Sequence, residues 1–448
     1  MDVLQVILFT YLAVVTGIGI YSFFRVRTAA DYYVSGKRGG WLQISGSLFA
    51  TIMGGSAILG TVELSQKAGW PAAWFLLSAA AGLVVLSFIS RRISILGHYT
   101  LPELLLRFYG RKAEMAASIL IPVAWTGIVA AQIIAGAKII SSLQLTSYDQ
   151  GALICGIVFI FYTIAGGQLS ILKTDFAQAF IILAGIFTML VLRLLHPAGA
   201  EAGPTVPAEL FNDRFSPADL FFLLLTYSVT FVVGPDIYSR IFCARNPQVA
   251  KKSVITTAIL MVPVAFSLTY LGVAASDAAG ASNGFILPGT GFLPPWALGL
   301  IAAALLSAVM SSADTTLLTS SMILSELITG NLDKPSSLRL TRLFIVVMGA
   351  VSLAIALHIT SILNALLISL SFFSGAFVIP IIAGLAGWSI NRENVIYAIL
   401  AGGMLSLSGK VFNEITAQET GYWLIAAGFA ANYVILKLRW KREGERTT

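Results

Sequence analysis

Apolar residues fill the chain in runs of roughly 20, and short breaks of polar residues, glycine or proline separate the runs. A helix of about 20 residues crosses a hydrocarbon core of about 30 Å. The pattern therefore predicts an all-α fold, a polytopic membrane helical bundle of about 13 transmembrane helices. The predicted spans are 2–24, 40–66, 71–90, 114–142, 147–168, 172–195, 217–242, 253–276, 294–328, 340–358, 361–388, 394–411 and 419–437.

Composition supports an integral membrane protein, because 57% of the residues are hydrophobic and 11% are charged, against about 25% charged in soluble proteins. The loops are too short for a soluble catalytic or nucleic-acid-binding domain, so we expect no nucleic acid partner and no obligatory protein partner. Cys155 and Cys243 lie in or beside apolar spans without metal-ligand spacing. We therefore expect no enzyme activity and no metal or redox chemistry of cysteine.

The basic residues predict how the chain is oriented. With the N-terminus outside, the inner segments hold all 28 lysines and arginines except Lys67, Lys138, Arg193, Arg214 and Lys410. The positive-inside rule then predicts a multi-pass protein of the cell (inner or plasma) membrane, with the N-terminus outside and the C-terminus cytoplasmic. The basic tail "KLRWKREGERTT" is expected to rest on anionic lipid of the bilayer.

Two adjacent glycines, Gly54 and Gly55, lie in the middle of the second span, "ISGSLFATIMGGSAILGTVELS". Glycine costs about 1 kcal/mol relative to alanine inside a helix. The pair is a plausible point for the helix to unwind and present backbone carbonyls to a binding site. The glycines by themselves fit a close-packing face of small residues better.

The ninth span ends in "SAVMSSADTTLLTSS", residues 307–321, which holds eight serine and threonine residues and Asp314. Ser307, Ser311 and Thr315 share one helix face, and hydroxyl oxygens can replace the water around a hard cation. Bare hydroxyls more often pack helices together. A carboxylate at a helix centre costs about 2.5–3.5 kcal/mol on insertion scales, so Asp314 favours a polar path or a cation site.

Four segments in order resemble the sodium/solute symporter family: "RVRTAADYYVSGKRGG", "TIAGGQLSILKTDFAQ", "GPDIYSRIFCARNPQVAKKS" and "SAVMSSADTTLLTSS". They cover about residues 20–330. The resemblance implies a leucine-transporter-type fold, a 5+5 inverted repeat with discontinuous helices. The implied parts are 1–39, a leading helix and inner loop; 40–195, the first repeat; 196–216, an outer loop; 217–388, the second inverted repeat; and 389–448, two trailing helices and a basic cytoplasmic tail.

The resemblance also implies binding sites. The principal sodium (Na+) site falls on the carbonyls of Ala50, Met53 and Ala308 and the hydroxyls of Ser311 and Ser312. A second cation or proton site falls on Asp175, Asp314 and Thr315, although Asp175 alone is as consistent with an interfacial acid beside Lys173. The solute is expected beside Gly55, Ser56, Leu59, Trp74, Ser78, Gln132, Tyr227, Thr230, Phe231 and Phe372.

These features favour a secondary active transporter that couples sodium to a small-molecule solute by alternating access. The predicted pocket positions of the seventh span offer one hydroxyl among aromatic residues, which favours an amino acid, a monocarboxylate or a related metabolite over a sugar. A proton-coupled carrier on the same fold is favoured by the acids Asp175 and Asp314. A solute-sensing membrane domain stays open, whereas local polarity argues against a passive channel.

Overall fold

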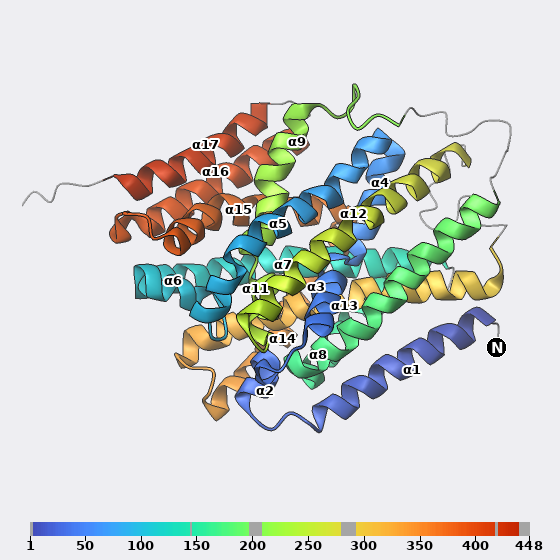
Figure 1. Ribbon diagram of the computed structural model, residues 1–448, viewed down its shortest axis with the longest axis horizontal. Helices are drawn as coiled ribbons and strands as arrows, with labels where there is room; N and C mark the ends of the chain where they lie inside the picture. Colours follow the sequence, from blue (N-terminus) through green and yellow to red (C-terminus); the bar gives the residue numbers. More distant parts are fainter. Residues whose placement is uncertain (1–2, 144–145, 197–207, 279–292, 417–419, 439–448) are drawn as a thin grey trace, which may run out of the picture.

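The computed structural model describes residues 3–143, 146–196, 208–278, 293–416 and 420–438, and they form one helical bundle (Figure 1). In the view of Figure 1, α1 and α17 lie on opposite sides of the bundle. The elements are α1 Val3–Phe23, α2 Ala29–Val34, η1 Ser35–Lys37, α3 Trp41–Ile52, α4 Gly55–Ala68, η2 Trp70–Ala72, α5 Ala73–Leu96, α6 Leu101–Tyr109, α7 Arg111–Ser142, α8 Tyr148–Leu195, α9 Pro217–Leu223, η3 Leu224–Ser228, α10 Val229–Val233, α11 Pro235–Cys243, α12 Pro247–Ala278, α13 Pro295–Thr329, α14 Pro335–His358, α15 Ile362–Ala386, η5 Arg392–Asn394, α16 Val395–Thr416 and α17 Thr420–Lys437.

The helices confirm the all-α membrane bundle, and each predicted span overlaps one helix or a series of helices. α8 has 48 residues and covers the predicted spans 147–168 and 172–195; Gly167, at φ 56° and ψ −177°, interrupts it between them. Within the described residues, nine helices are long and apolar enough to cross a membrane, or ten if α3 and α4 count as one span. Thirteen spans therefore stays a prediction. The basic tail and much of the outer loop 196–216 lie outside the described residues.

The second span is broken at the adjacent glycines, as the family resemblance implies. α3 ends at Ile52 and α4 begins at Gly55, with a bend of 51° between them. Met53 has φ −78° and ψ 45°, and Gly54 is extended at φ −64° and ψ 166°. The glycines therefore mark a discontinuous helix as well as a tightly packed one.

The seventh span holds a second break that the sequence analysis did not predict. The predicted helix 217–242 is instead divided into α9, the π-helical segment η3, α10 and α11. Gly234 is extended at φ −65° and ψ 130°, and Pro235 begins α11. The dipeptide Gly-Pro inside an apolar run was the available signal, because proline lacks the N–H that a continuous helix needs.

α13 carries the serine- and threonine-rich segment 307–321, which we call the hydroxyl run, and it lies in the interior of the protein. α13 packs against α8, α7, α14, α1 and α3. Every residue from 307 to 323 is buried. The hydroxyl groups and Asp314 therefore face other helices and not lipid, which is where ionisable groups in membrane proteins are tolerated.

Candidate functional site

The break between α3 and α4 meets the hydroxyl run of α13. The Ser311 hydroxyl donates to the Ala50 carbonyl at 2.8 Å and is also 3.2 Å from the Ala308 carbonyl. The Ser312 hydroxyl donates to the carbonyl of Thr51 at 2.6 Å. Four of the five residues predicted for the principal sodium site are therefore at one junction of two helices, with Thr51 as an additional carbonyl.

Met53, the fifth predicted residue, lies at the same junction. It is fully buried and directly precedes Gly54. A Cβ atom built on Gly54 would be 2.9 Å from the Ser312 Cβ, so the unwound backbone passes directly beside α13. The junction supplies carbonyl and hydroxyl oxygens from two helices, and oxygen donors of this kind suit a hard cation.

Gly55 gives a test of this close approach. A Cβ atom there would lie 3.0 Å from the Ala135 Cβ and would overlap Val309 of α13. We expect Gly55→Ala to push α4 away from α13, to lower transport strongly and to cost about 1–3 kcal/mol of stability, as overpacking does. The measurements are solute uptake and thermal unfolding of the purified protein.

Gly17→Ala is the matched control, because a Cβ atom at Gly17 of α1 would meet no atom within 4 Å. This variant should transport as the wild type does. Normal uptake by Gly55→Ala would contradict the tight junction.

A second polar cluster joins α3, α8, α11 and α13 around Arg240. Arg240 Nη2 donates to Asp175 Oδ2 at 2.8 Å, and both side chains are fully buried. The same nitrogen donates to Thr315 and, at 3.3 Å, to Thr51. Ser47 also donates to Asp175 Oδ2, at 2.6 Å. A guanidinium group therefore lies between Asp175 and Thr315, two residues predicted to share a second cation or proton.

The location of Arg240 corrects the sequence analysis, which counted it among the basic residues of inner segments. Its exposed fraction is 0%. The break at Gly234 begins the short helix α11, and Arg240 lies on it inside the bundle next to α3 and α13. A buried arginine is rarely left without an acidic partner, so the acid in "KTDFAQ" was the signal that could have indicated this pair.

Asp314 lies beside this cluster with part of its carboxylate free. Its Oδ1 is 3.4 Å from the Thr315 hydroxyl. Among the described residues, Asp314 Oδ2, Asp175 Oδ1, Gln178 Oε1 and the Ser307 hydroxyl are buried without a hydrogen-bond partner. Buried polar atoms are normally paired, so these oxygens mark a place where a cation or proton could bind.

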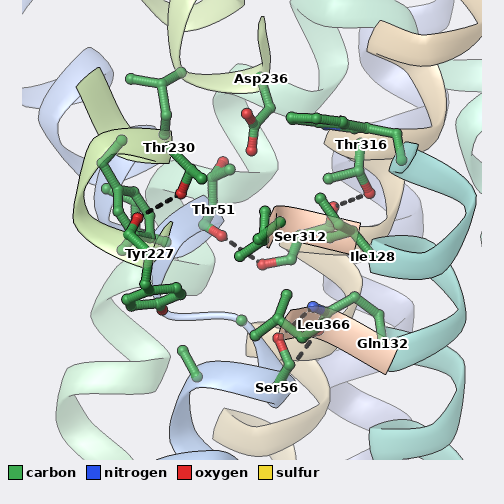
Figure 2. Close-up of a pocket in the computed structure, with 17 residues that line it drawn as sticks. Thr51, Ser56, Ile128, Gln132, Tyr227, Thr230, Asp236, Ser312, Thr316 and Leu366 are labelled. Carbon is green, nitrogen blue, oxygen red and sulfur yellow. Dashed lines mark hydrogen bonds between the residues drawn. The ribbon is translucent and has the colours of Figure 1, made fainter. Parts of the chain in front are cut away.

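A cavity with about 530 Å³ of empty space opens beside the α3–α4 break (Figure 2). Its lining includes Thr51, Gly54 and Ser312, so it adjoins the principal junction. Five of the ten residues predicted for the solute also line it: Ser56, Gln132, Tyr227, Thr230 and Phe231. The Gln132 amide donates to the Ser56 hydroxyl at 2.7 Å, which fixes α7 against the start of α4.

The other five predicted solute residues do not line this cavity. Gly55 packs against α13, and Leu59 lines a separate apolar cavity. Trp74 donates from its indole nitrogen to the carbonyl of Leu210, in the segment that precedes α9, at 3.0 Å. Ser78 is fully buried on α5, and Phe372 faces α16 at Gly403.

Asp236 and Trp125 also line the cavity and were missed. Asp236 follows the unpredicted break at Gly234, so its position could not be read from a continuous helix. Trp125 is one aromatic residue in a long apolar span, and nothing in the sequence distinguishes it from a packing residue.

Comparison with known proteins agrees with this geometry. The family model described as "Sodium:solute symporter family" matches residues 32–402. The chain belongs to this family. It is therefore a membrane-embedded sodium/solute transporter and not an enzyme.

Two curated relatives of this symporter differ in how much of the chain they match. The sodium/pantothenate symporter of Escherichia coli (strain K12) is 25% identical over 434 residues, 89% of this chain and 88% of the relative. The sodium/glucose cotransporter 2 of Rattus norvegicus is 29% identical over 199 residues, 43% of this chain and 29% of the relative. The pantothenate relative is thus similar along most of its length, and the glucose relative over a part.

Solved structures share the fold of this symporter. A Na+-coupled sialic acid symporter matches with a TM-score of 0.80 at 19% identity, covering 98% of this chain and 97% of that one. MHP1, a nucleobase-cation-symport-1 family transporter, matches with a TM-score of 0.60 at 13% identity, covering 90% and 93%. The expected leucine-transporter-type fold is confirmed.

Proposed function

We propose that this symporter uses sodium, bound between the α3–α4 break and α13, to drive a small organic solute through the adjoining cavity by alternating access. The observation that carries the proposal is the contact of Ser311 and Ser312 with the carbonyls of Ala50 and Thr51. These hydroxyl and carbonyl oxygens can turn from each other to a sodium ion. The ion would then join the two helices that flank the cavity.

The coupling is thermodynamic. A sodium ion that contacts both helices in one state of the carrier, and loses one of them in the other, has a different affinity for each state, and that difference can shift their populations. One elementary charge that moves through 100 mV supplies about 2.3 kcal/mol. We propose an extracellular N-terminus and a cytoplasmic C-terminus in the cell membrane. We also propose that sodium enters the carrier from the extracellular side, down its electrochemical gradient.

Uptake into proteoliposomes tests the proposal. The solute is first identified by its binding to the purified protein. An imposed inward sodium gradient should then drive its accumulation in the proteoliposomes. Potassium at equal concentration on both sides, without sodium, should not drive accumulation. Equal uptake under both conditions would reject sodium coupling. Uptake driven by a pH gradient without sodium would support the proton-coupled alternative.

The aromatic residues of the cavity support a solute smaller and less hydroxylated than a sugar. Tyr227 and Phe231 lie with ring centroids 5.0 Å apart, and Thr230 gives its hydroxyl to the carbonyl of Tyr227 at 2.6 Å. Ser56 and Gln132 bind each other, and Ser312 and Thr316 donate to main-chain carbonyls, so few side-chain groups of the lining are left to bind several sugar hydroxyls. This supports the predicted class, an amino acid, a monocarboxylate or a related metabolite, over a sugar.

We also propose that Asp314 binds a second monovalent cation, a sodium ion or a proton. The free Oδ atoms of Asp314 and Asp175 support this, because two buried carboxylates cannot both be ionised at low cost beside a single guanidinium. We expect Asp314→Asn to move one elementary charge fewer per solute than the wild type. The ratio of electrogenic current to radiolabelled solute uptake measures this number.

Asp149→Asn, an exposed acid in the first turn of α8, is the matched control for Asp314→Asn. Its charge-to-solute ratio should equal that of the wild type. An unchanged ratio in Asp314→Asn would remove Asp314 from the coupling. Repeating the measurement with and without sodium, and at two pH values, identifies which cation is lost.

A further inference from the structure

Asp236 lines the cavity, and its carboxylate has no role in the proposed function so far. It lies in the first turn of α11, directly after the break at Gly234, and is half-buried. Figure 2 shows it on the same side of the cavity as Thr51 and Thr230. A Cβ atom built on Gly234 would lie 2.9 Å from Asp236 Oδ1, so the carboxylate lies close to the break.

No basic side chain balances this carboxylate in the cavity. The described residues that line it include Asp236 and no lysine, arginine or histidine. Arg240 lies one turn further along α11 and attracts the Asp236 carboxylate, but its guanidinium forms its ion pair with Asp175, at 2.8 Å. A carboxylate inside a membrane protein is costly unless a cation accompanies it, and a positively charged group of the ligand would supply that cation within the cavity.

The proposed sodium junction lies only partly at this cavity. Ala50, Ala308 and Ser311, which hold the centre of the junction, do not line the cavity. Asp236 therefore shares the cavity with Thr51 and Ser312, but not with the other residues of the proposed sodium site.

Aromatic rings complete a surface that suits a positively charged group. Tyr227 and Phe231 line the cavity with their rings at 82° to each other, and Trp125 lines it from α7. Tyr227 is itself held by stacking on Phe75, with centroids 4.3 Å apart. The faces of aromatic rings attract ammonium groups, and burial strengthens that attraction.

We infer that the transported solute carries an ammonium group, bound between the Asp236 carboxylate and the rings of Tyr227 and Phe231. The inference rests on the proposed function and narrows it: amino acids, amines and quaternary ammonium compounds fit, and simple monocarboxylates do not. The common feature is a positive charge on a small organic body. A solute of this kind would be drawn by charge to Asp236 and oriented by the rings.

Matched pairs of compounds test the charge. The purified full chain is heated with sodium and with potassium in the presence of alanine or lactate, which differ in an ammonium against a hydroxyl group. A second pair is choline and its uncharged isostere, in which a tert-butyl group replaces the trimethylammonium group. A wider panel compares the other natural amino acids and polyamines with monocarboxylates and sugars. A ligand that binds the native state raises the unfolding temperature.

We expect stabilisation in sodium by at least one ammonium compound and none by its uncharged or anionic counterpart. Asp236→Asn should weaken that binding about 10- to 100-fold, as loss of a charge-assisted hydrogen bond does, while Asp149→Asn should leave it unchanged. Stabilisation by a monocarboxylate, a sugar or an uncharged isostere, or by no ammonium compound, would overturn the inference.

Sodium alone separates this inference from the proposed function. Stabilisation of the wild type by sodium in place of potassium, without any solute, reports the ion site. If it is absent, the proposed function fails. If it is present and only anionic or neutral solutes bind, the ammonium inference fails by itself. The same sodium effect in Asp236→Asn shows that this variant is folded.

Discussion

Arg240→Gln is expected to destabilise the protein by about 3–5 kcal/mol, the usual cost of breaking a buried ion pair by removing one partner. Arg240 and Asp175 are both fully buried, and the guanidinium also donates to Thr315 and Thr51. Its loss would leave the Asp175 carboxylate without a cation in the core. Unfolding of the purified protein in mixed micelles of increasing denaturing detergent measures the change in the free energy of unfolding.

An exposed ion pair is the matched control. Arg107 and Glu103 lie 3.2 Å apart on α6, with 49% and 18% of their side chains exposed. Arg107→Gln should cost about 0–1 kcal/mol, as surface pairs do. The double variant Arg240→Gln with Asp175→Asn should recover part of the lost stability, because no charge is left alone. A cost for Arg240→Gln no larger than that for Arg107→Gln would contradict the buried pair.

Ser312→Ala is expected to raise the sodium concentration for half-maximal uptake about 10- to 100-fold, the factor expected when one oxygen contact to a charged group is lost. The Ser312 hydroxyl reaches the carbonyl of Thr51 at 2.6 Å and so lies at the unwound end of α3. Uptake of radiolabelled solute at a series of sodium concentrations gives the half-maximal value. Protein yield and unfolding temperature should change little.

Ser320→Ala on the same helix is the control for Ser312→Ala. Ser320 is fully buried, but its hydroxyl binds the carbonyls of Thr316 and Leu317 in its own helix, at 2.8 and 3.1 Å. The variant Ser320→Ala therefore removes a buried hydroxyl from the same helix and leaves the α3–α4 break unchanged. Sodium dependence should follow the wild type. Equal sodium dependence in Ser312→Ala and Ser320→Ala would remove Ser312 from the ion site.

Local sequence features made a break in the second span plausible, and the family resemblance predicted that the break meets the ninth span. Paired glycines weaken one helix, and a carboxylate among hydroxyls marks a helix that must face other protein in a membrane. Both signals are contained in short segments. The contacts of Ser311 with Ala50 and Ala308 show that the aligned positions are neighbours in space; whether they bind sodium stays a prediction.

The pocket was harder to predict, because its lining depends on how helices far apart in the sequence are rotated and broken. The continuous helix predicted for residues 217–242 hid the break at Gly234, and with it the inward placement of Asp236 and Arg240. Trp74 of α5 donates to the carbonyl of Leu210, a residue far from it in the sequence. No periodicity within one helix contains that information.

Equilibrium binding of radiolabelled sodium to the purified protein, without solute, tests most directly whether the α3–α4 break and α13 share an ion. We expect saturable sodium binding to the wild type and to Ser320→Ala. In the double variant Ser311→Ala with Ser312→Ala, we expect the sodium binding of highest affinity to be lost. Binding of the same affinity and amount in the folded double variant would contradict it.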